Sequence, residues 1–84
     1  MSHQISTVSQ LGMILEGIRK SSGLTQKDIF MESGILQKTI SSLENSPENS
    51  SIGTLFKLLA ALDVDIVLEP RKNLDQKQIM RADW

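Results

Sequence analysis

The chain of 84 residues contains no cysteine, a single tryptophan and few aromatic residues. Without cysteine there is no disulfide framework and no thiolate metal site, a composition that suits a reducing cytoplasm. No apolar run approaches the roughly 20 residues that span a bilayer, and the N-terminus lacks the basic-then-apolar order of a signal peptide. We therefore expect a cytoplasmic protein with no membrane partner.

The sequence also lacks the residues of a catalytic site. Its one histidine, His3, lies in the polar N-terminal segment, where a lone exposed histidine is expected to be inert. There is no glycine-rich phosphate loop, and no two carboxylates stand at a clear catalytic spacing. We therefore expect no enzyme, no cofactor and no metal site.

An excess of positive charge is absent as well, because 9 Lys and Arg stand against 10 Asp and Glu for a net charge of −1. This balance argues against a polycation that coats nucleic acid, but it does not exclude a DNA reader, for which the position of each charge matters. The cations begin only at Arg19 and, apart from Lys57, fall into two groups: Arg19, Lys20, Lys27 and Lys38, then Arg71, Lys72, Lys77 and Arg81.

What the chain does contain is helical periodicity on the scale of one small domain. Such a domain buries little more than about 60% of its unfolded surface, so it gains stability from a partner. Apolar residues from Val8 to Ile18 recur at helical intervals and predict a helix over 8–21, begun by a capping box from Thr7. Gly12 and Gly17 weaken this helix by roughly 1 kcal/mol each relative to alanine, but they allow close packing against a neighbour.

Residues 24–44 organise the rest of the chain. Thr25 stands three residues before Asp28, the spacing of an acidic capping box, so a helix is predicted over about 25–32, ending at Gly34. A second short helix is predicted over 36–44, and two helices joined by a short glycine-containing turn form a helix-turn-helix. The candidate inward positions are Leu24, Ile29, Phe30, Ile35, Ile40 and Leu43.

A fourth helix is predicted over 51–62, after a polar loop at 45–50. Its apolar stripe is wide enough to close the core of a bundle and to leave apolar surface over. The stripe consists of Ile52, Leu55, Phe56, Leu58, Leu59 and Leu62. The expected fold is mainly α, a small helical bundle.

Residues 64–69 change the period, because they are β-branched and partly alternating, and they predict a strand that ends at Pro70. One strand is not stable alone, and nothing else in the chain resembles a strand. We favour pairing with the same strand of a second subunit, since proteins usually cover an unpaired apolar edge. The alternative is an extended segment packed on the bundle. The candidate dimerisation residues are Val64, Ile66, Val67 and Leu68.

The last residue is a tryptophan, which is unusual at the end of a polar tail. Tryptophan is costly to leave in water and is enriched at binding hot spots, so Met80 and Trp84 are candidate partner-binding residues. The alternative is a flexible end that carries a tryptophan by chance. The expected organisation is a flexible N-terminus at 1–6, a DNA-binding and dimerisation domain at 7–69, and a flexible tail at 70–84.

In this order, the motifs resemble the Xre/Cro-like helix-turn-helix family. The resemblance covers roughly residues 8–64 and implies a lambda-repressor-like bundle. Phe30 departs from the pattern, because a smaller alanine is common there, so the local packing should differ. The matching residues are Leu24-Thr25-Gln26, Gly34-Ile35, Ile40-Ser41-Ser42-Leu43-Glu44 and Thr54-Leu55.

A closer resemblance is to HipB-type antitoxins, the DNA-binding partners of HipA-type kinase toxins. It includes Thr39-Ile40-Ser41, Glu44-Asn45, the loop at 45–50, the strand and the terminal Trp84. The resemblance implies a homodimer with an intersubunit sheet, and a tail that contacts the toxin and takes part in proteolytic turnover. It also implies an antitoxin that represses its own operon and binds or helps to neutralise a HipA-like kinase toxin.

Base contacts are expected from the second helix of the helix-turn-helix, which enters the major groove with its N-terminal residues toward the base edges. Glutamine can pair with adenine and lysine with guanine, so Gln37 leads the candidates and Lys38 follows. Thr39 and Ser42 can add hydroxyl contacts. Ser41 either faces DNA or bonds to the preceding turn.

Phosphate contacts are expected at the start of the preceding helix, where free amides can receive a phosphate. Thr25, Gln26 and Lys27 are the candidates, with Arg19 and Lys20 as further backbone contacts. Two of these residues have alternative roles. Thr25 can act as a cap, and the resemblance to the Xre/Cro-like family implies that Gln26 either contacts the phosphate backbone or braces the recognition helix. Glu44 is expected to be structural.

A two-fold dimer would place two recognition helices about 34 Å apart and read an inverted repeat in double-stranded DNA. Two other functions stay open. One is a stand-alone Xre-type repressor without a toxin partner. The other is a protein-interaction module that keeps the bundle without binding DNA, which the near-neutral charge permits.

Overall fold

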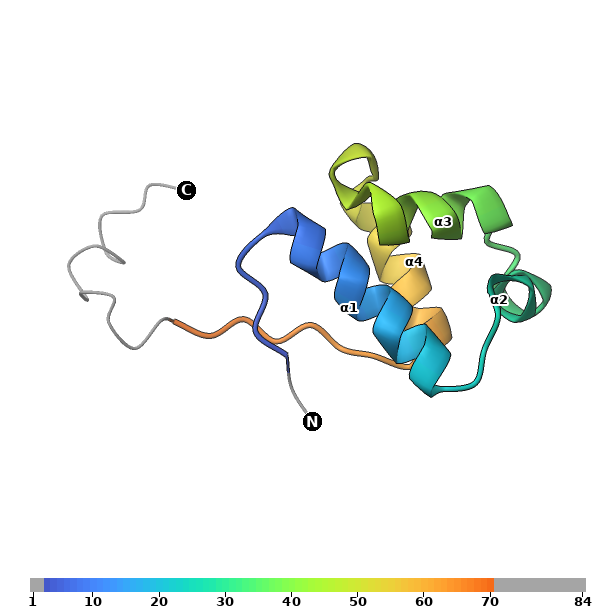
Figure 1. The fold of residues 1–84 in the computed structure, drawn as a ribbon, viewed down its shortest axis with the longest axis horizontal. Helices are drawn as coiled ribbons and strands as arrows, with labels where there is room; N and C mark the ends of the chain where they lie inside the picture. Colours follow the sequence, from blue (N-terminus) through green and yellow to red (C-terminus); the bar gives the residue numbers. More distant parts are fainter. Residues whose placement is uncertain (1–2, 71–84) are drawn as a thin grey trace.

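The computed structural model describes residues 3–70 (Figure 1). This range contains four α-helices and one short 3₁₀ helix: α1 (Val8–Ser21), α2 (Gln26–Ser33), α3 (Gln37–Asn45), η1 (Pro47–Asn49) and α4 (Ile52–Leu62). All four predicted α-helices are confirmed, the first with the predicted bounds and the others to within one residue. The polar loop at 45–50 contains the 3₁₀ turn.

Hydroxyl side chains cap three of the four described α-helices. Thr7 accepts a hydrogen bond from the Gln10 amide, Thr25 from the Asp28 amide and Ser51 from the Thr54 amide. These bonds satisfy amides that the first turn of a helix leaves without a partner. The local sequence therefore determines where α1, α2 and α4 begin.

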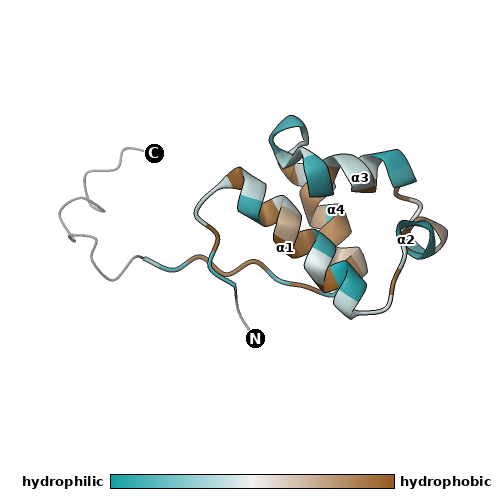
Figure 2. Ribbon diagram, viewed as in Figure 1, coloured by the Kyte–Doolittle hydropathy of each residue, from teal (hydrophilic) through white to brown (hydrophobic). Residues whose placement is uncertain are grey.

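The core lies where the apolar stripes of the helices meet. The outer surface of the helix-turn-helix is more polar, and Figure 2 shows hydrophilic colouring on much of α2 and at the start of α3. α1 packs on α3 and η1, and α2 packs on α3 and α4. The buried residues are Leu15, Ile29, Ile35, Ile40, Leu43, Leu58, Leu59 and Leu62.

The inward position predicted for Phe30 is wrong, because its exposed fraction is 36% whereas that of Ile29 is 1%. Successive helix residues are about 100° apart, and α2 turns only Ile29 of this pair fully into the core. Ile29 takes the buried position. The departure of Phe30 from the family pattern therefore concerns the surface.

Close contact between α1 and α3 depends on Gly12, which confirms the prediction that this glycine allows close packing against a neighbour. A Cβ atom at this position would lie 2.4 Å from the carbonyl oxygen of Glu44. No side chain larger than hydrogen fits unless the helices separate. A Cβ atom built on Gly17 would have nothing within 4 Å, so this glycine is not needed for packing within the described part of the chain.

Residues 64–70 leave α4 as an extended segment, and no strand occurs within residues 3–70. The amide of Val64 donates to the Leu59 carbonyl, and its side chain packs on the core. Ile66, Val67 and Leu68 are exposed at 44%, 73% and 91%. The predicted pairing needs a second chain, so it stays a prediction.

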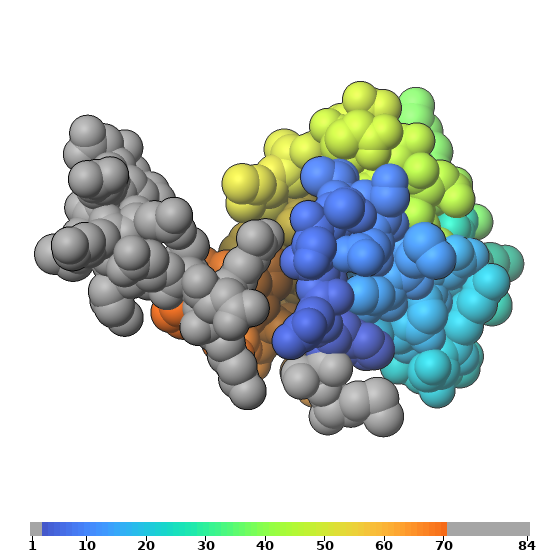
Figure 3. All heavy atoms as spheres, turned by 60° about the vertical axis from the view of Figure 1, so that its left-hand side comes forward, coloured from blue at the N-terminus to red at the C-terminus, as the bar shows by residue number. Residues whose placement is uncertain are grey.

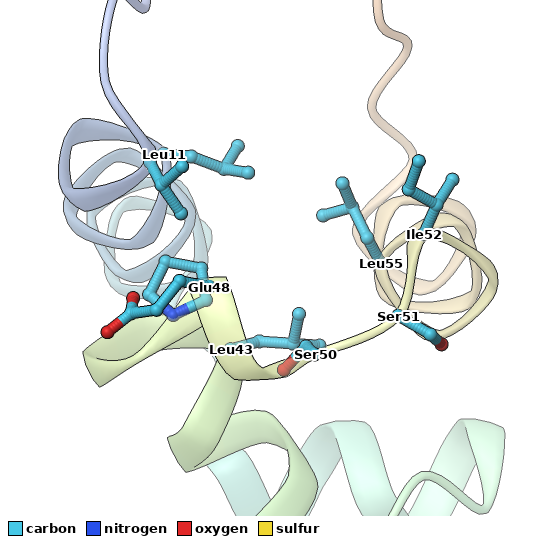
Figure 4. A pocket seen from close by; sticks show the side chains of 9 residues that line it. Leu11, Leu43, Glu48, Ser50, Ser51, Ile52 and Leu55 are labelled. Atoms are coloured by element: carbon cyan, nitrogen blue, oxygen red, sulfur yellow. The ribbon is translucent and has the colours of Figure 1, made fainter.

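A shallow apolar groove of about 200 Å³ lies between the starts of α1 and α4. Leu11 faces Leu55 and Ile52 across it (Figure 4). In the space-filling view, α1 and the start of α4 lie on the same face of the molecule (Figure 3). Ile52 and Phe56 remain 73% and 54% exposed, so the stripe of α4 leaves apolar surface over, as predicted.

Candidate nucleic-acid interface

The start of α2 is fixed by a reciprocal capping box. The Asp28 amide donates to the Thr25 hydroxyl at 3.0 Å, and the Thr25 amide donates to the Asp28 carboxylate at 2.8 Å. The bond from the Thr25 backbone, followed by the Thr25 side chain, lowers the pKa of Asp28 below its ordinary value. Thr25 is therefore a cap here, and its contact with a phosphate stays a prediction.

The turn between α2 and α3 is stabilised by the left-handed Gly34 and by hydrogen bonds of the Ser33 hydroxyl. Gly34 has a φ of 80°, in the left-handed region that glycine accepts without strain, and its amide donates to the Phe30 carbonyl. The Ser33 hydroxyl donates to the Ile29 carbonyl and accepts from the Ile35 amide. Ile35 is buried beneath the turn. These contacts fix the direction in which α3 leaves α2.

The predicted base-reading residues lie on the outer side of α3. Gln37, Lys38 and Ser42 are exposed, whereas Thr39 and Ser41 are half-buried. Ile40 and Leu43 are buried on the opposite side of the helix. The structure thus presents polar side chains at the start of α3, where a helix-turn-helix meets base edges.

Within the described residues, the Ser41 side chain bonds to Asn45 and not to the preceding turn. Its hydroxyl accepts from the Asn45 side-chain amide at 3.1 Å, and that amide also donates to the Ser41 carbonyl at 2.9 Å. The contact holds the last turn of α3 together. Contact between Ser41 and DNA stays a prediction.

A buried polar network holds the far end of α3. Arg19 donates to both carboxylate oxygens of Glu44, at 2.6 Å and 3.1 Å, and to the Leu24 carbonyl at 2.9 Å. The side-chain amide of Gln26 donates to the same carboxylate at 3.2 Å. The hydrogen bond from Arg19 to Glu44 raises the pKa of Arg19 above its ordinary value. One carboxylate thus ties together α1, α2 and α3.

The network corrects one expectation and supports two. The phosphate contact considered for Arg19 is wrong in this structure, because its side chain is 8% exposed and committed to Glu44. A buried cation is costly unless it is paired, and the Glu44 carboxylate, itself 2% exposed, supplies the partner. Glu44 is structural, as expected, and Gln26 takes the bracing role that was its alternative.

Of the lysines considered for DNA phosphates, Lys20 at the end of α1 and Lys27 at the start of α2 are both exposed. Lys20 lies 3.0 Å from the Glu16 carboxylate, an exposed pair of the kind that contributes little. An incoming phosphate can therefore compete with Glu16 for Lys20.

Sequence reasoning did not single out Leu36, the residue directly before α3. It is 55% exposed, and its side chain makes no cap hydrogen bond. The prediction began this helix at residue 36, one residue too early, so Leu36 was counted inside the helix and its place at the cap, where serine or threonine is usual, was not seen.

The remaining candidates lie away from this surface or outside the described residues. Val64 is half-buried against the core, so the exposed part of the predicted dimer segment is Ile66 to Leu68. Met80 and Trp84 lie outside residues 3–70. Within that range, no three His, Cys, Asp or Glu residues gather into a possible metal site. None of the described helices is long and apolar enough to cross a membrane.

Comparison with known proteins decides the family. The helix-turn-helix family profile matches residues 15–68. Antitoxin HipB of Escherichia coli strain CFT073 is 36% identical over 84 residues, covering 99% of this chain and 89% of that protein. Antitoxin HipB of Escherichia coli strain K12 is 38% identical over 74 residues, covering 87% and 84%.

The chain belongs to the HipB family of helix-turn-helix antitoxins. Its fold agrees with solved structures of that family. A chain of the HipA-HipB-O2-O3 complex superposes with a TM-score of 0.79 at 34% identity, covering 84% of this chain and all of the other. A chain of the HipB-O4 20mer complex gives the same values. The similarity to HipB in sequence and in fold thus extends well beyond the helix-turn-helix itself.

Proposed function

We propose that this chain is a sequence-specific DNA-binding antitoxin that represses its own operon and binds or helps to neutralise a HipA-like kinase toxin. The observation that carries the proposal is the exposure of Gln37 and Lys38 at the start of a helix that buried contacts hold at both ends. The HipB relatives support it, because their solved structures include a complex with HipA and complexes with O2, O3 and O4. The protein acts in the cytoplasm by binding, without catalysis.

In this proposal, α3 enters the major groove. Gln37 reads an adenine and Lys38 a guanine, and Thr39, Ser41 and Ser42 add hydroxyl contacts. Thr25, Gln26 and Lys27 lie against the phosphates beside the groove, where they position the protein without specifying sequence. Lys20 adds one more phosphate contact.

The DNA-binding claim is tested with the full chain and duplexes selected from a library with a random core. We expect selection of an inverted repeat, and an affinity for it that falls steeply with salt because each neutralised phosphate releases counterions. Replacing Lys20 and Lys27 by alanine should make the salt dependence shallower, because both are proposed phosphate contacts. If no sequence is enriched over random duplex, the chain is a protein-interaction module that does not read DNA.

The homodimer in this proposal forms when Ile66, Val67 and Leu68 pair with the same segment of a second subunit. Three successive exposed apolar residues in an extended segment support this, because such an edge is a liability unless it is covered. Val64 anchors the segment to its own bundle. Val67→Pro in the full chain removes a ladder donor, so it should yield a monomer by sedimentation. A chain truncated after Asp63 tests the same claim, and a truncated chain that is still fully dimeric would contradict it.

The tail residues Met80 and Trp84 are proposed to contact the toxin. Trp84→Ala in the full chain should recover less of a co-expressed HipA-like toxin in a pull-down, while operator binding is unchanged. Equal recovery would remove Trp84 from that role. The reading frame next to the gene separates this antitoxin from a stand-alone repressor, which would have no toxin neighbour.

A further inference from the structure

Leu36 breaks two local rules at once. Three of the four described α-helices begin with a hydroxyl residue whose side chain caps the first turn, and α3 begins with a leucine that makes no cap bond. Its carbonyl still accepts from the Thr39 and Ile40 amides, so the backbone starts the helix without help from the side chain. The side chain is also 55% exposed. Leucine is among the poorest cap residues, so local stability does not explain this choice.

The position of Leu36 suggests what explains it. It directly precedes Gln37 and Lys38, which are exposed and lead the proposed base-reading surface. Conflicts between a residue and its local structure are expected at functional sites. The core does not need this side chain, because the neighbouring Ile35 is the residue that anchors the turn.

We infer that Leu36 is a specificity-determining residue that packs against the C5-methyl group of a thymine next to the base read by Gln37. The C5-methyl of thymine is the apolar group that base edges present in the major groove, so it is the partner that an exposed leucine fits there. Burying both apolar groups removes them from water. The inference rests on the proposed function and adds to it a preference for thymine that Gln37 and Lys38 do not provide.

The contact is tested with duplexes in which single thymines of the selected site are replaced by deoxyuridine, symmetrically in both half-sites. This replacement removes the C5-methyl and keeps every hydrogen-bonding group. For the unaltered chain, deoxyuridine at one of the tested positions should weaken binding by about fourfold per half-site, the effect expected for burial of one methyl-sized group. For Leu36→Ala, the thymine and deoxyuridine duplexes should bind equally at that position.

Two further variants separate base reading from a structural role. Leu36→Ser supplies a normal cap, so its melting temperature should rise by a few degrees while its sensitivity to the methyl group is lost. Met13→Ala, a matched control at an apolar residue of α1 that is 70% exposed, should keep the full sensitivity. A structural role for Leu36 would instead lower the melting temperature of both Leu36 variants.

The outcomes distinguish this inference from the proposed function. If an operator is bound but no deoxyuridine weakens binding, or if Leu36→Ala keeps the same sensitivity, the inference is wrong and the DNA-binding proposal stands. If no duplex is selected at all, the DNA-binding proposal fails and the inference fails with it. Loss of toxin binding in Leu36→Ala with unchanged thymine sensitivity would place Leu36 at a protein interface instead.

Discussion

The Nε atom of Arg19 lies 2.6 Å from the Oε2 atom of Glu44, joining the last turn of α1 to the last turn of α3. Both side chains are nearly inaccessible, at 8% and 2% exposure. Within residues 3–70, no buried side-chain nitrogen or oxygen lacks a hydrogen-bond partner. This pair therefore fixes the far end of the recognition helix while the near end carries the exposed residues.

Breaking the pair from one side should be costly. In Arg19→Met the Glu44 carboxylate stays buried without its cation, and such losses cost about 3–5 kcal/mol of unfolding free energy. Urea denaturation measures this loss. The double variant Arg19→Met with Glu44→Leu should recover much of the stability, because two apolar side chains leave no buried charge. A single variant that loses less than about 1 kcal/mol would contradict this account.

Gly12→Ala and Gly17→Ala should act in opposite directions although both glycines lie within α1. Alanine in a helix is better than glycine by roughly 0.5–1 kcal/mol, and Gly17→Ala should gain about that much because nothing lies near its Cβ position. At Gly12 the new methyl meets the Glu44 carbonyl, and overpacking of this kind costs about 1–3 kcal/mol. Thermal denaturation of the two variants tests this. Equal stabilisation by both would show that α1 and α3 separate freely.

At acidic pH the protein should lose the contribution that the Asp28 carboxylate makes to the free energy of unfolding through its capping box. Because the folded-state pKa is lowered from 3.8, this contribution is fully present above about that pH and is lost as the pH falls through the folded-state pKa. The difference in unfolding free energy between the unaltered chain and Asp28→Asn should therefore shrink as the pH is lowered below 3.8. An NMR titration of the Asp28 carboxyl carbon gives the folded-state value directly. A midpoint at or above 3.8 would contradict the hydrogen bonds described here.

Gln37→Ala should relax specificity at one base pair of the operator half-site. A bidentate glutamine contact is worth about 1–3 kcal/mol of discrimination against the wrong base. Binding to the selected site should weaken, whereas binding to random duplex should be unchanged, in fluorescence anisotropy at one fixed salt concentration. A uniform loss on all sequences would mean that Gln37 is not a base reader. Ser42→Ala, at another exposed position of α3, shows how much a weaker contact contributes.

Elements whose ends are marked by local chemistry could be predicted from the sequence. Thr7, Thr25 and Ser51 mark helix starts and Gly34 marks a helix end, because caps and left-handed turns depend on residues a few positions apart. The outward position of Lys38 also follows, since the helical period turns it away from Ile40 and Leu43. The exposure of Gln37, three residues before Ile40, does not follow from the period. Phe30 was misplaced because period alone does not say which of two adjacent apolar residues a short helix buries.

By itself, the sequence determined the bounds of the helices, the turn of the helix-turn-helix and most of the polar face of α3, because caps, turns and helical period depend on residues a few positions apart. Only the tertiary structure decided the partner of Arg19, because the ion pair joins residues 25 positions apart and the charge of an arginine suits a phosphate as well as a buried carboxylate. It also decided that Gly12 is required, because that need arises from the Glu44 carbonyl on another helix. The exposure of Leu36 likewise depends on how α3 packs, and no local pattern contains that information.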